Sequence, residues 1–198
     1  MPDSVKSRAL PEFCAAVVNR HASAWPPAEH QLAQEFLAHF GIAGLAYYDG
    51  LIKWCGEVGI DVSTAELPHD MRGFNYWHER GMSILMPVNG GYFLSREHTL
   101  FHELRELLEY VFEDLGHEVA DQNTLESRAE EFAACVRIAI HVELAKDFFR
   151  MAGEVRHPLG RACAYGFVGL VMAASVMGCA GIRQLEAQFE AQRKYSTT

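Results

Sequence analysis

Two adjacent ionisable residues, His102 and Glu103, could bind a metal ion and activate water on it if the chain around them is helical. They occupy the first two positions of the H-E-x-x-H pattern, in which two histidines one turn apart bind zinc and the glutamate acts as general base. Glu106 stands where the second histidine belongs. Its carboxylate would still lie one helical turn from His102, so the central question is whether this face binds a metal.

The same face also has a simpler interpretation. At about 100° per residue, four polar residues fall opposite the apolar face marked by Leu104, and we expect them to point away from that core: His98, His102, Glu106 and Glu109. A surface helix needs a polar face of this kind. On this helix alone, solvated side chains are the more common outcome.

A second motif favours the interpretation as a metal site. Glu126 opens a stretch of the form E-x-x-A-x-x-F-A, and Arg96 opens an earlier stretch of the form R-x-x-T-L-x-H-E-L. Together they resemble the ImmA/IrrE family of metallopeptidases, whose core reads R-x-x-T-L-A-H-E-L-G-H followed by E-x-x-A-x-x-F-A. In that family a small sheet precedes the active-site helix, and the next helix carries the third ligand. The region from about 51 to 137 is expected to follow this order.

The resemblance implies a zincin-like site. His102 would bind zinc, and Glu103 would be the general base. Glu126 would be the glutamate ligand, with Glu106 in the place of the second histidine. Three ligands leave a fourth position for water, whose pKa the ion lowers. One imidazole and two carboxylates form a harder donor set than the family's, so Mn²⁺ or Fe²⁺ are alternatives to Zn²⁺. Arg105 replaces the motif's glycine and is expected to be exposed.

His98 is an alternative ligand, because it lies one turn before His102 on the same side of the helix. It cannot act together with Glu106, since about 12 Å of helix separates them and ligand bonds are about 2 Å long. His141 is excluded, because about 22 Å of helix separates it from Glu126. The side chain that would stabilise the oxyanion stays open among Tyr48, Tyr76 and His78.

The composition argues against several classes of protein, including proteins that bind nucleic acid and proteins built on disulfides. The 198 residues are 49% hydrophobic and 22% charged, which is enough for one sizeable core. A net charge of −9 would repel a phosphate backbone, so a protein or small-molecule partner is expected rather than nucleic acid. Five cysteines, an odd number without C-x-x-C spacing, argue against a disulfide framework and suit a reducing cytoplasm. The N-terminus lacks the charged-then-apolar order of a signal peptide.

Hydrophobic periodicity predicts an α+β fold in which helices dominate a small antiparallel or mixed sheet. Helices are expected from Pro11 to the break at 25–27, and over 28–40, 51–58, about 95–115 and about 125–153. A strand is expected at 60–62 and a hairpin over 74–77 and 82–86. Gly41, Gly59 and Gly116 are expected to end helices. We expect a single domain over 1–198, with a helical extension at 154–198 beyond the ImmA/IrrE-like core.

The segment 162–182 contains no charged residue and is long enough to cross a bilayer. Its glycines and other small residues suit either a close-packed membrane helix or a buried helix. Arg161 and Arg183 flank it without an inside–outside asymmetry, so a buried helix is expected.

Three hypotheses follow. The first is an active cytoplasmic metallopeptidase that uses His102, Glu103, Glu106 and Glu126; by resemblance it would be regulatory and would cleave a helix-turn-helix repressor. The second is a relative without metal that serves as a protein-binding or sensing module, because loss of a histidine ligand is a common route to an inactive site. The third is a membrane-attached version, anchored through 162–182.

Overall fold

The computed structural model describes residues 9–41, 45, 47–68, 71–78, 81–88 and 96–154, and positions 158, 160–163, 165, 166 and 169. Of His78 and Phe148 only the backbone is described. The chain divides into two compact units, Met1–Arg137 and Ile138–Thr198.

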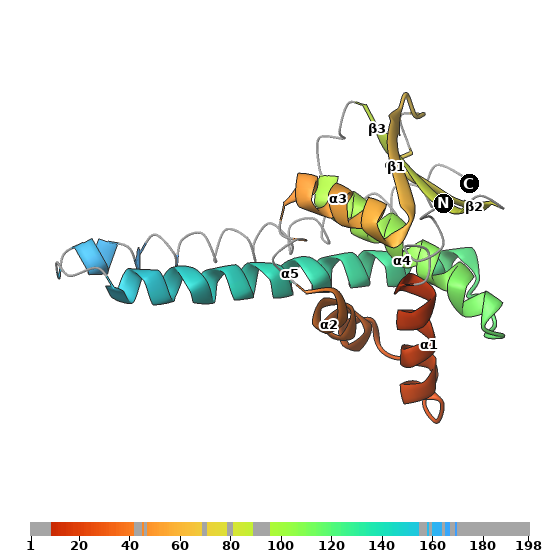
Figure 1. Ribbon diagram of the computed structural model, residues 1–198, viewed down its shortest axis with the longest axis horizontal. Helices are drawn as coiled ribbons and strands as arrows, with labels where there is room; N and C mark the ends of the chain where they lie inside the picture. The colour runs from red at the N-terminus through yellow and green to blue at the C-terminus, as the bar shows by residue number, and fades with distance from the viewer. Residues whose placement is uncertain are drawn as a thin grey trace, which may run out of the picture. The chain divides into compact units, whose positions relative to one another are not determined.

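Five helices in the described residues confirm the helix-dominated expectation (Figure 1): α1 (Ala9–His21), α2 (Glu29–Phe40), α3 (Tyr48–Val58), α4 (Arg96–Asp114) and α5 (Gln122–Glu154). The predicted helices lie within a few residues of these bounds. Gly41, Gly59 and Gly116 follow the helices that they were expected to end, with φ angles of +80°, +88° and +89°. Only glycine adopts such positive φ values without a steric penalty, which is why the helices end there.

The sheet has three strands, β1 (Ile60–Ala65), β2 (Phe74–His78) and β3 (Gly81–Pro87), in the spatial order β1-β3-β2. The predicted hairpin is confirmed, because β2 and β3 pair in antiparallel fashion with Asn75 opposite Ile84. β1 pairs with β3 in parallel, which makes the sheet mixed. Central strand β3 is mostly buried, whereas β2 leaves Phe74, Tyr76 and Trp77 partly exposed.

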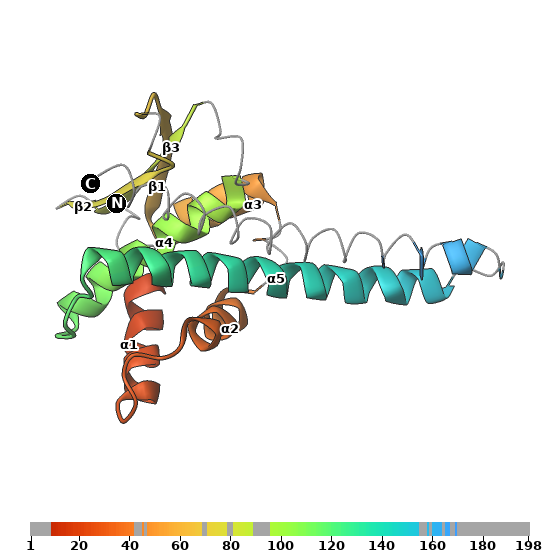
Figure 2. The same cartoon turned by 180° about the vertical axis from the view of Figure 1, so that it is seen from behind.

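Helix α4 lies between the sheet and α1 (Figures 1 and 2). One side of α4 contacts β2 and β3, and another side contacts α1. Helix α3 packs against β1. The apolar face predicted for α4 is fully buried at Leu100, Phe101, Leu104, Leu107 and Leu108.

A buried aromatic cluster joins elements that are far apart in the sequence. Phe36 of α2 packs edge-on against Phe101 of α4 and Phe132 of α5, with ring centroids 6.5 and 5.7 Å apart. Edge-to-face packing at such distances adds to the stability gained from burial. The cluster fixes the N-terminal part of α5 beside α4, where the predicted site residues lie.

Helix α5 begins with a side-chain cap that the sequence predictions did not include. Asp121 accepts hydrogen bonds from the backbone N–H groups of Asn123 and Thr124 at 3.1 and 3.2 Å. The Thr124 hydroxyl donates to the other carboxylate oxygen of Asp121 at 2.6 Å. Because the cap lies five residues before Glu126, it sets the start of the helix turn that carries this residue.

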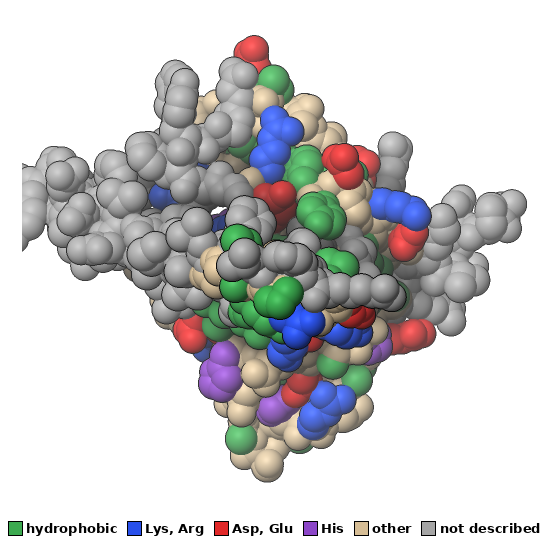
Figure 3. Space-filling view, turned by 90° about the vertical axis from the view of Figure 1, so that its left-hand side faces the viewer, with side chains coloured by type: hydrophobic (Ala, Val, Ile, Leu, Met, Phe, Trp, Pro, Cys, Tyr) green, Lys and Arg blue, Asp and Glu red, His purple; other side chains and the backbone are tan. Residues whose placement is uncertain are grey.

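Among the described residues, no helix has the length and apolar character needed to cross a membrane. Most of the segment 162–182 lies outside those residues, and so does most of the predicted extension at 154–198. On the face of the molecule in Figure 3, acidic, basic and apolar side chains are intermixed.

Candidate metal centre

Three of the predicted site residues come together between α4 and α5. His102 and Glu106 lie one turn apart on α4, and Glu126 lies in the second turn of α5. One ligand atom from each falls within 4.8 Å of the others, an arrangement that could hold a metal ion. Nε2 of His102 is 3.3 Å from Oε2 of Glu126 and 3.7 Å from Oε1 of Glu106.

These separations fit a first-row metal ion. Two donors bound to one tetrahedral ion through bonds of about 2.0–2.1 Å lie about 3.3 Å apart. The His102–Glu126 pair has this separation, and the His102–Glu106 pair is wider by a few tenths of an ångström. One imidazole and two carboxylates are also donors that zinc, manganese and iron accept. The residues present therefore fit such an ion.

Glu103, the predicted general base, lies beside this group and is held by a residue of the sheet. Asn75 of β2 donates through Nδ2 to Oε2 of Glu103 at 2.7 Å and to Oε2 of Glu106 at 2.5 Å. Gly73 leaves room for Glu103, because a Cβ atom at position 73 would lie 2.4 Å from Oε1 of Glu103. The Asn75 hydrogen bond therefore orients a carboxylate for which the absence of a side chain at position 73 leaves space.

The electrostatics of the site follow from burial and crowding of charges. Burial raises the pKa of Glu103 to about 7, although the Asn75 contact and the charge of His102 lower it. Burial alone would lower the pKa of His102, but its contacts with Glu126 and Glu130 and the charges of two more carboxylates raise it to about 10. The contact with His102 lowers the pKa of Glu126. Four carboxylates thus surround one imidazole, which favours a bound cation.

His98 is not part of the three-residue group among the described residues. Its side chain is 2% exposed, and its Nε2 lies 2.7 Å from Oε1 of Glu130 on α5. Glu109 is also buried, at 5% exposure. The simpler interpretation, in which the side chains of this face are solvated, is therefore wrong for these two residues. The polar face of α4 is covered by other elements, and both side chains have polar partners there: Glu130 lies beside His98, and Arg105 and Arg128 lie beside Glu109.

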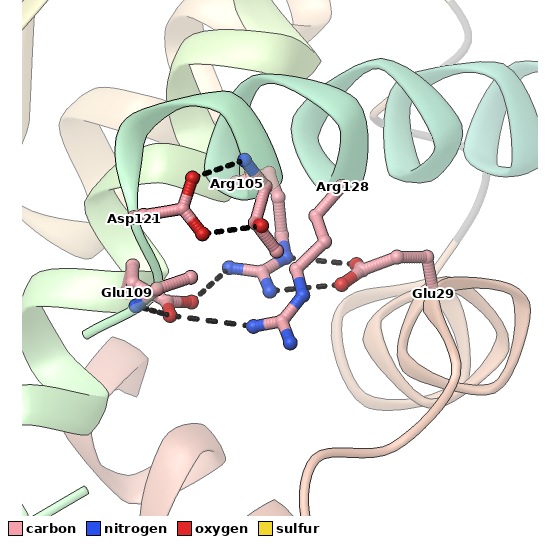
Figure 4. Close-up of polar contacts among 7 residues, drawn as sticks. Glu29, Arg105, Glu109, Asp121 and Arg128 are labelled. Carbon is pink, nitrogen blue, oxygen red and sulfur yellow. Dashed lines mark hydrogen bonds and ion pairs between the residues drawn. The ribbon is translucent and has the colours of Figure 1, made fainter. Parts of the chain in front are cut away.

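The prediction that Arg105 is exposed was also wrong, because its side chain is 2% exposed. Figure 4 shows it between two carboxylates. Nε and Nη2 of Arg105 donate to the two oxygens of Glu29 at 2.8 Å each, and Nη1 donates to Glu109 at 2.7 Å. Glu109 also accepts from the backbone N–H of Ala120 and lies 3.5 Å from Arg128. The residue in the motif's glycine position thus ties α4 to the start of α2.

Three residues near the site were missed by the sequence analysis. Asn75 and Glu130 contact the predicted site residues directly. Burial raises the pKa of the Tyr110 hydroxyl, and the nearby charges of Glu106, Glu113 and Glu103 raise it further. Helical spacing could have found Tyr110, which lies one turn after Glu106, and Glu130, which lies one turn after Glu126. No sequence signal pointed to Asn75, because it comes from a strand.

No protein-family model, curated protein or solved structure matches this chain. The resemblance to the ImmA/IrrE family therefore rests on the two motifs quoted above and on the order of the elements around them.

Proposed function

We propose that the protein is a metal-dependent endopeptidase of the ImmA/IrrE kind. The observation that carries this proposal is the convergence of His102, Glu106 and Glu126, with their donor atoms within 4.8 Å, directly beside the buried carboxylate of Glu103. A metal at this position, when bound, acidifies water and polarises a carbonyl group. Zn²⁺ is the first candidate, and Mn²⁺ or Fe²⁺ are the alternatives that two carboxylate ligands favour.

The role of Glu103 in this proposal is to take a proton from the attacking water and deliver it to the leaving amine. A general base works best when its pKa lies near the working pH, and burial raises the pKa of Glu103 to about 7. Asn75 donates to one oxygen of Glu103, which keeps the other oxygen, the one facing Gly73, in a fixed position. Asn75 thereby orients the base and the ligand Glu106 together.

The proposed substrate is a protein. By resemblance, the first candidate is a helix-turn-helix repressor in the cytoplasm, whose cleavage would switch genes on. The net charge of −9 supports a protein substrate over direct binding to nucleic acid.

The metal content of the full-length protein tests this proposal first. Protein purified without chelator and dialysed against Zn²⁺ is expected to carry about one equivalent of metal by elemental analysis. His102→Ala should lose this metal, because it removes the one nitrogen donor of the group. His30→Ala, which changes an exposed histidine on α2, serves as the control and should keep the metal. Wild-type protein that stays metal-free under supplementation would exclude the peptidase function.

A second candidate function has its own support. His102 already contacts Glu126 and Glu130, and Asn75 bridges Glu103 and Glu106, so the site is internally paired without an ion. This pairing favours a metal-free protein-binding or sensing module. Binding of the candidate repressor without cleavage, by protein that takes up no metal, would support this function over the peptidase.

A further inference from the structure

The carboxylate of Glu130 lies between two histidines of α4. Its Oε1 is 2.7 Å from Nε2 of His98, and its Oε2 is 3.5 Å from Nδ1 of His102. Helical spacing explains this arrangement, because the two histidines lie one turn apart on α4 and Glu130 lies one turn after Glu126 on α5. Each carboxylate oxygen of Glu130 therefore lies beside one imidazole ring.

The two ring nitrogens of His102 face different partners. Nδ1 faces Glu130, whereas Nε2 faces Glu126 at 3.3 Å and Glu106 at 3.7 Å. An ionised carboxylate accepts hydrogen bonds but cannot donate them. Because carboxylates face both ring nitrogens, His102 can donate a proton from each of them. A divalent ion held by Glu106 and Glu126 would replace the proton on Nε2, and the proton on Nδ1 would remain directed at Glu130. Histidines that bind metals commonly donate their second N–H to a carboxylate, which fixes the ring and its tautomer.

We propose that Glu130 is a positioning residue that orients His102 for binding a divalent metal ion through Nε2, and that His98 holds Glu130 in place. This inference rests on the metal site proposed above and assigns His98 a supporting role instead of a ligand role. The side chains of His98 and Glu130 are 2% and 19% exposed, so little water competes for their contact. Their burial makes Glu130 a fixed anchor for the ring of His102.

Zinc affinity tests this role directly. In a competition titration of the full-length protein with a chelator, Glu130→Gln is expected to weaken Zn²⁺ binding by about 10- to 100-fold, the usual loss when such a partner is removed. Glu131→Gln, which changes the exposed neighbour on α5, is expected to leave the affinity unchanged. Glu103→Gln removes a charge beside His102 without removing the partner of Nδ1. If Glu103→Gln loses less Zn²⁺ affinity than Glu130→Gln, the effect of Glu130 comes from orienting His102 and not from its charge alone.

A double-mutant cycle separates positioning from a purely structural effect. If His98 acts through Glu130, His98→Leu weakens Zn²⁺ binding in the wild-type background. In the Glu130→Gln background, the same substitution causes no further loss of Zn²⁺ affinity. A spectroscopic signature completes the test. In the Co²⁺-loaded protein, the Nδ1–H proton of His102 gives a paramagnetically shifted NMR signal, which is expected to exchange with water faster in Glu130→Gln than in wild type. Additive losses of affinity together with an unchanged exchange rate would overturn the proposal.

Metal content and metal affinity together show whether the role of Glu130 fails alone or the proposed function fails with it. Wild-type protein that takes up no Zn²⁺, Mn²⁺ or Fe²⁺ would overturn both. Wild-type protein that binds one equivalent, with equal affinity in Glu130→Gln, would overturn only the role of Glu130. If Glu130→Gln does not fold, His98→Leu decides the question, since an unchanged affinity in that folded variant contradicts the proposal.

Discussion

Glu103 combines a raised pKa with a fixed orientation, which are the two properties that a general base requires. Burial accounts for the first property, and the hydrogen bond that Asn75 donates to Glu103 accounts for the second. An ordinary surface glutamate has neither property. This combination distinguishes Glu103 from the solvated polar face that the sequence alone equally allowed.

Replacing Glu103 by glutamine tests its chemistry. Glu103→Gln is nearly isosteric, so we expect the variant to keep its fold and one equivalent of metal while peptide cleavage falls by at least about a hundredfold. Cleavage of the candidate repressor, followed by gel and mass spectrometry, measures the effect. The control is Glu131→Gln, which should cleave like wild type. Equal cleavage by Glu103→Gln and wild type would contradict the assignment.

Gly73 offers a test of how closely Glu103 must be placed. Gly73→Ala puts a Cβ atom 2.4 Å from Oε1 of Glu103, so the carboxylate must move. We expect cleavage to fall about tenfold or more with metal content retained, because general-base catalysis depends on hydrogen-bond distance. In Gly56→Ala the new Cβ atom meets nothing within 4 Å, so this variant should keep full activity. Full activity in Gly73→Ala would show that the position of this carboxylate is not critical.

The candidate site residues lie on helices that the sequence predicted, α4 and α5, but the sequence analysis missed their partners. His102, Glu106 and Glu126 could be selected because helical spacing and the two motifs are local patterns. Asn75 reaches the site from β2, 28 residues before Glu103 in the chain, and periodicity does not encode such a contact. A polar residue with a buried partner looks the same in sequence as a solvated one.

At the scale of elements, boundaries were more predictable than contacts between elements. The glycines after α2, α3 and α4 set helix ends through backbone geometry that is visible in the sequence. Arg105 shows the limit of such local reasoning. Its principal partner, Glu29, lies 76 residues away, so nothing near Arg105 in the sequence indicated that it would be buried.

The ion pairs of Arg105 predict a large effect on stability. Arg105→Met fills similar space but leaves Glu29 buried without its bidentate partner, so we expect the free energy of unfolding to fall by about 3–5 kcal/mol. Urea unfolding of the metal-free protein measures this free energy. Arg20→Met removes an ion pair in which the arginine is 60% exposed, and should cost less than about 1 kcal/mol.

A second substitution checks the cause of this loss. Arg105→Met combined with Glu29→Gln should recover part of the lost stability, because the uncompensated charge at position 29 is gone. A loss below about 1 kcal/mol in Arg105→Met alone would show that the buried ion pairs do not hold α4 and α2 together.

At the scale of the whole molecule, the residues of the candidate site all belong to the unit Met1–Arg137. The buried thiols Cys14 on α1 and Cys55 on α3 belong to the same unit. Metal binding should therefore stabilise the fold that protects these thiols, because a ligand that binds only the folded state shifts the unfolding equilibrium. Thiol modification thus reports on metal binding without any substrate.

Thiol chemistry gives the corresponding prediction. Burial raises the pKa of Cys55 to about 12 and raises that of Cys14 still further above its usual value. Since the thiolate is the reactive form, neither should react with iodoacetamide in the folded protein, even when the pH rises from about 7 to about 9. Among the four cysteines that the structure describes, exposed Cys163 should react first, as mapped by peptide mass spectrometry.

The same assay then measures the effect of the metal. Mn²⁺ suits it because thiols bind this ion weakly. At about 100 times its Kd, the ion should stabilise the folded state by about 2.7 kcal/mol and slow modification of Cys14 and Cys55 about a hundredfold where modification requires unfolding. Cys163 is the internal control, and its rate should not change. Unchanged protection of both buried thiols in Mn²⁺-loaded protein would mean that the ion binds outside the folded unit that contains His102.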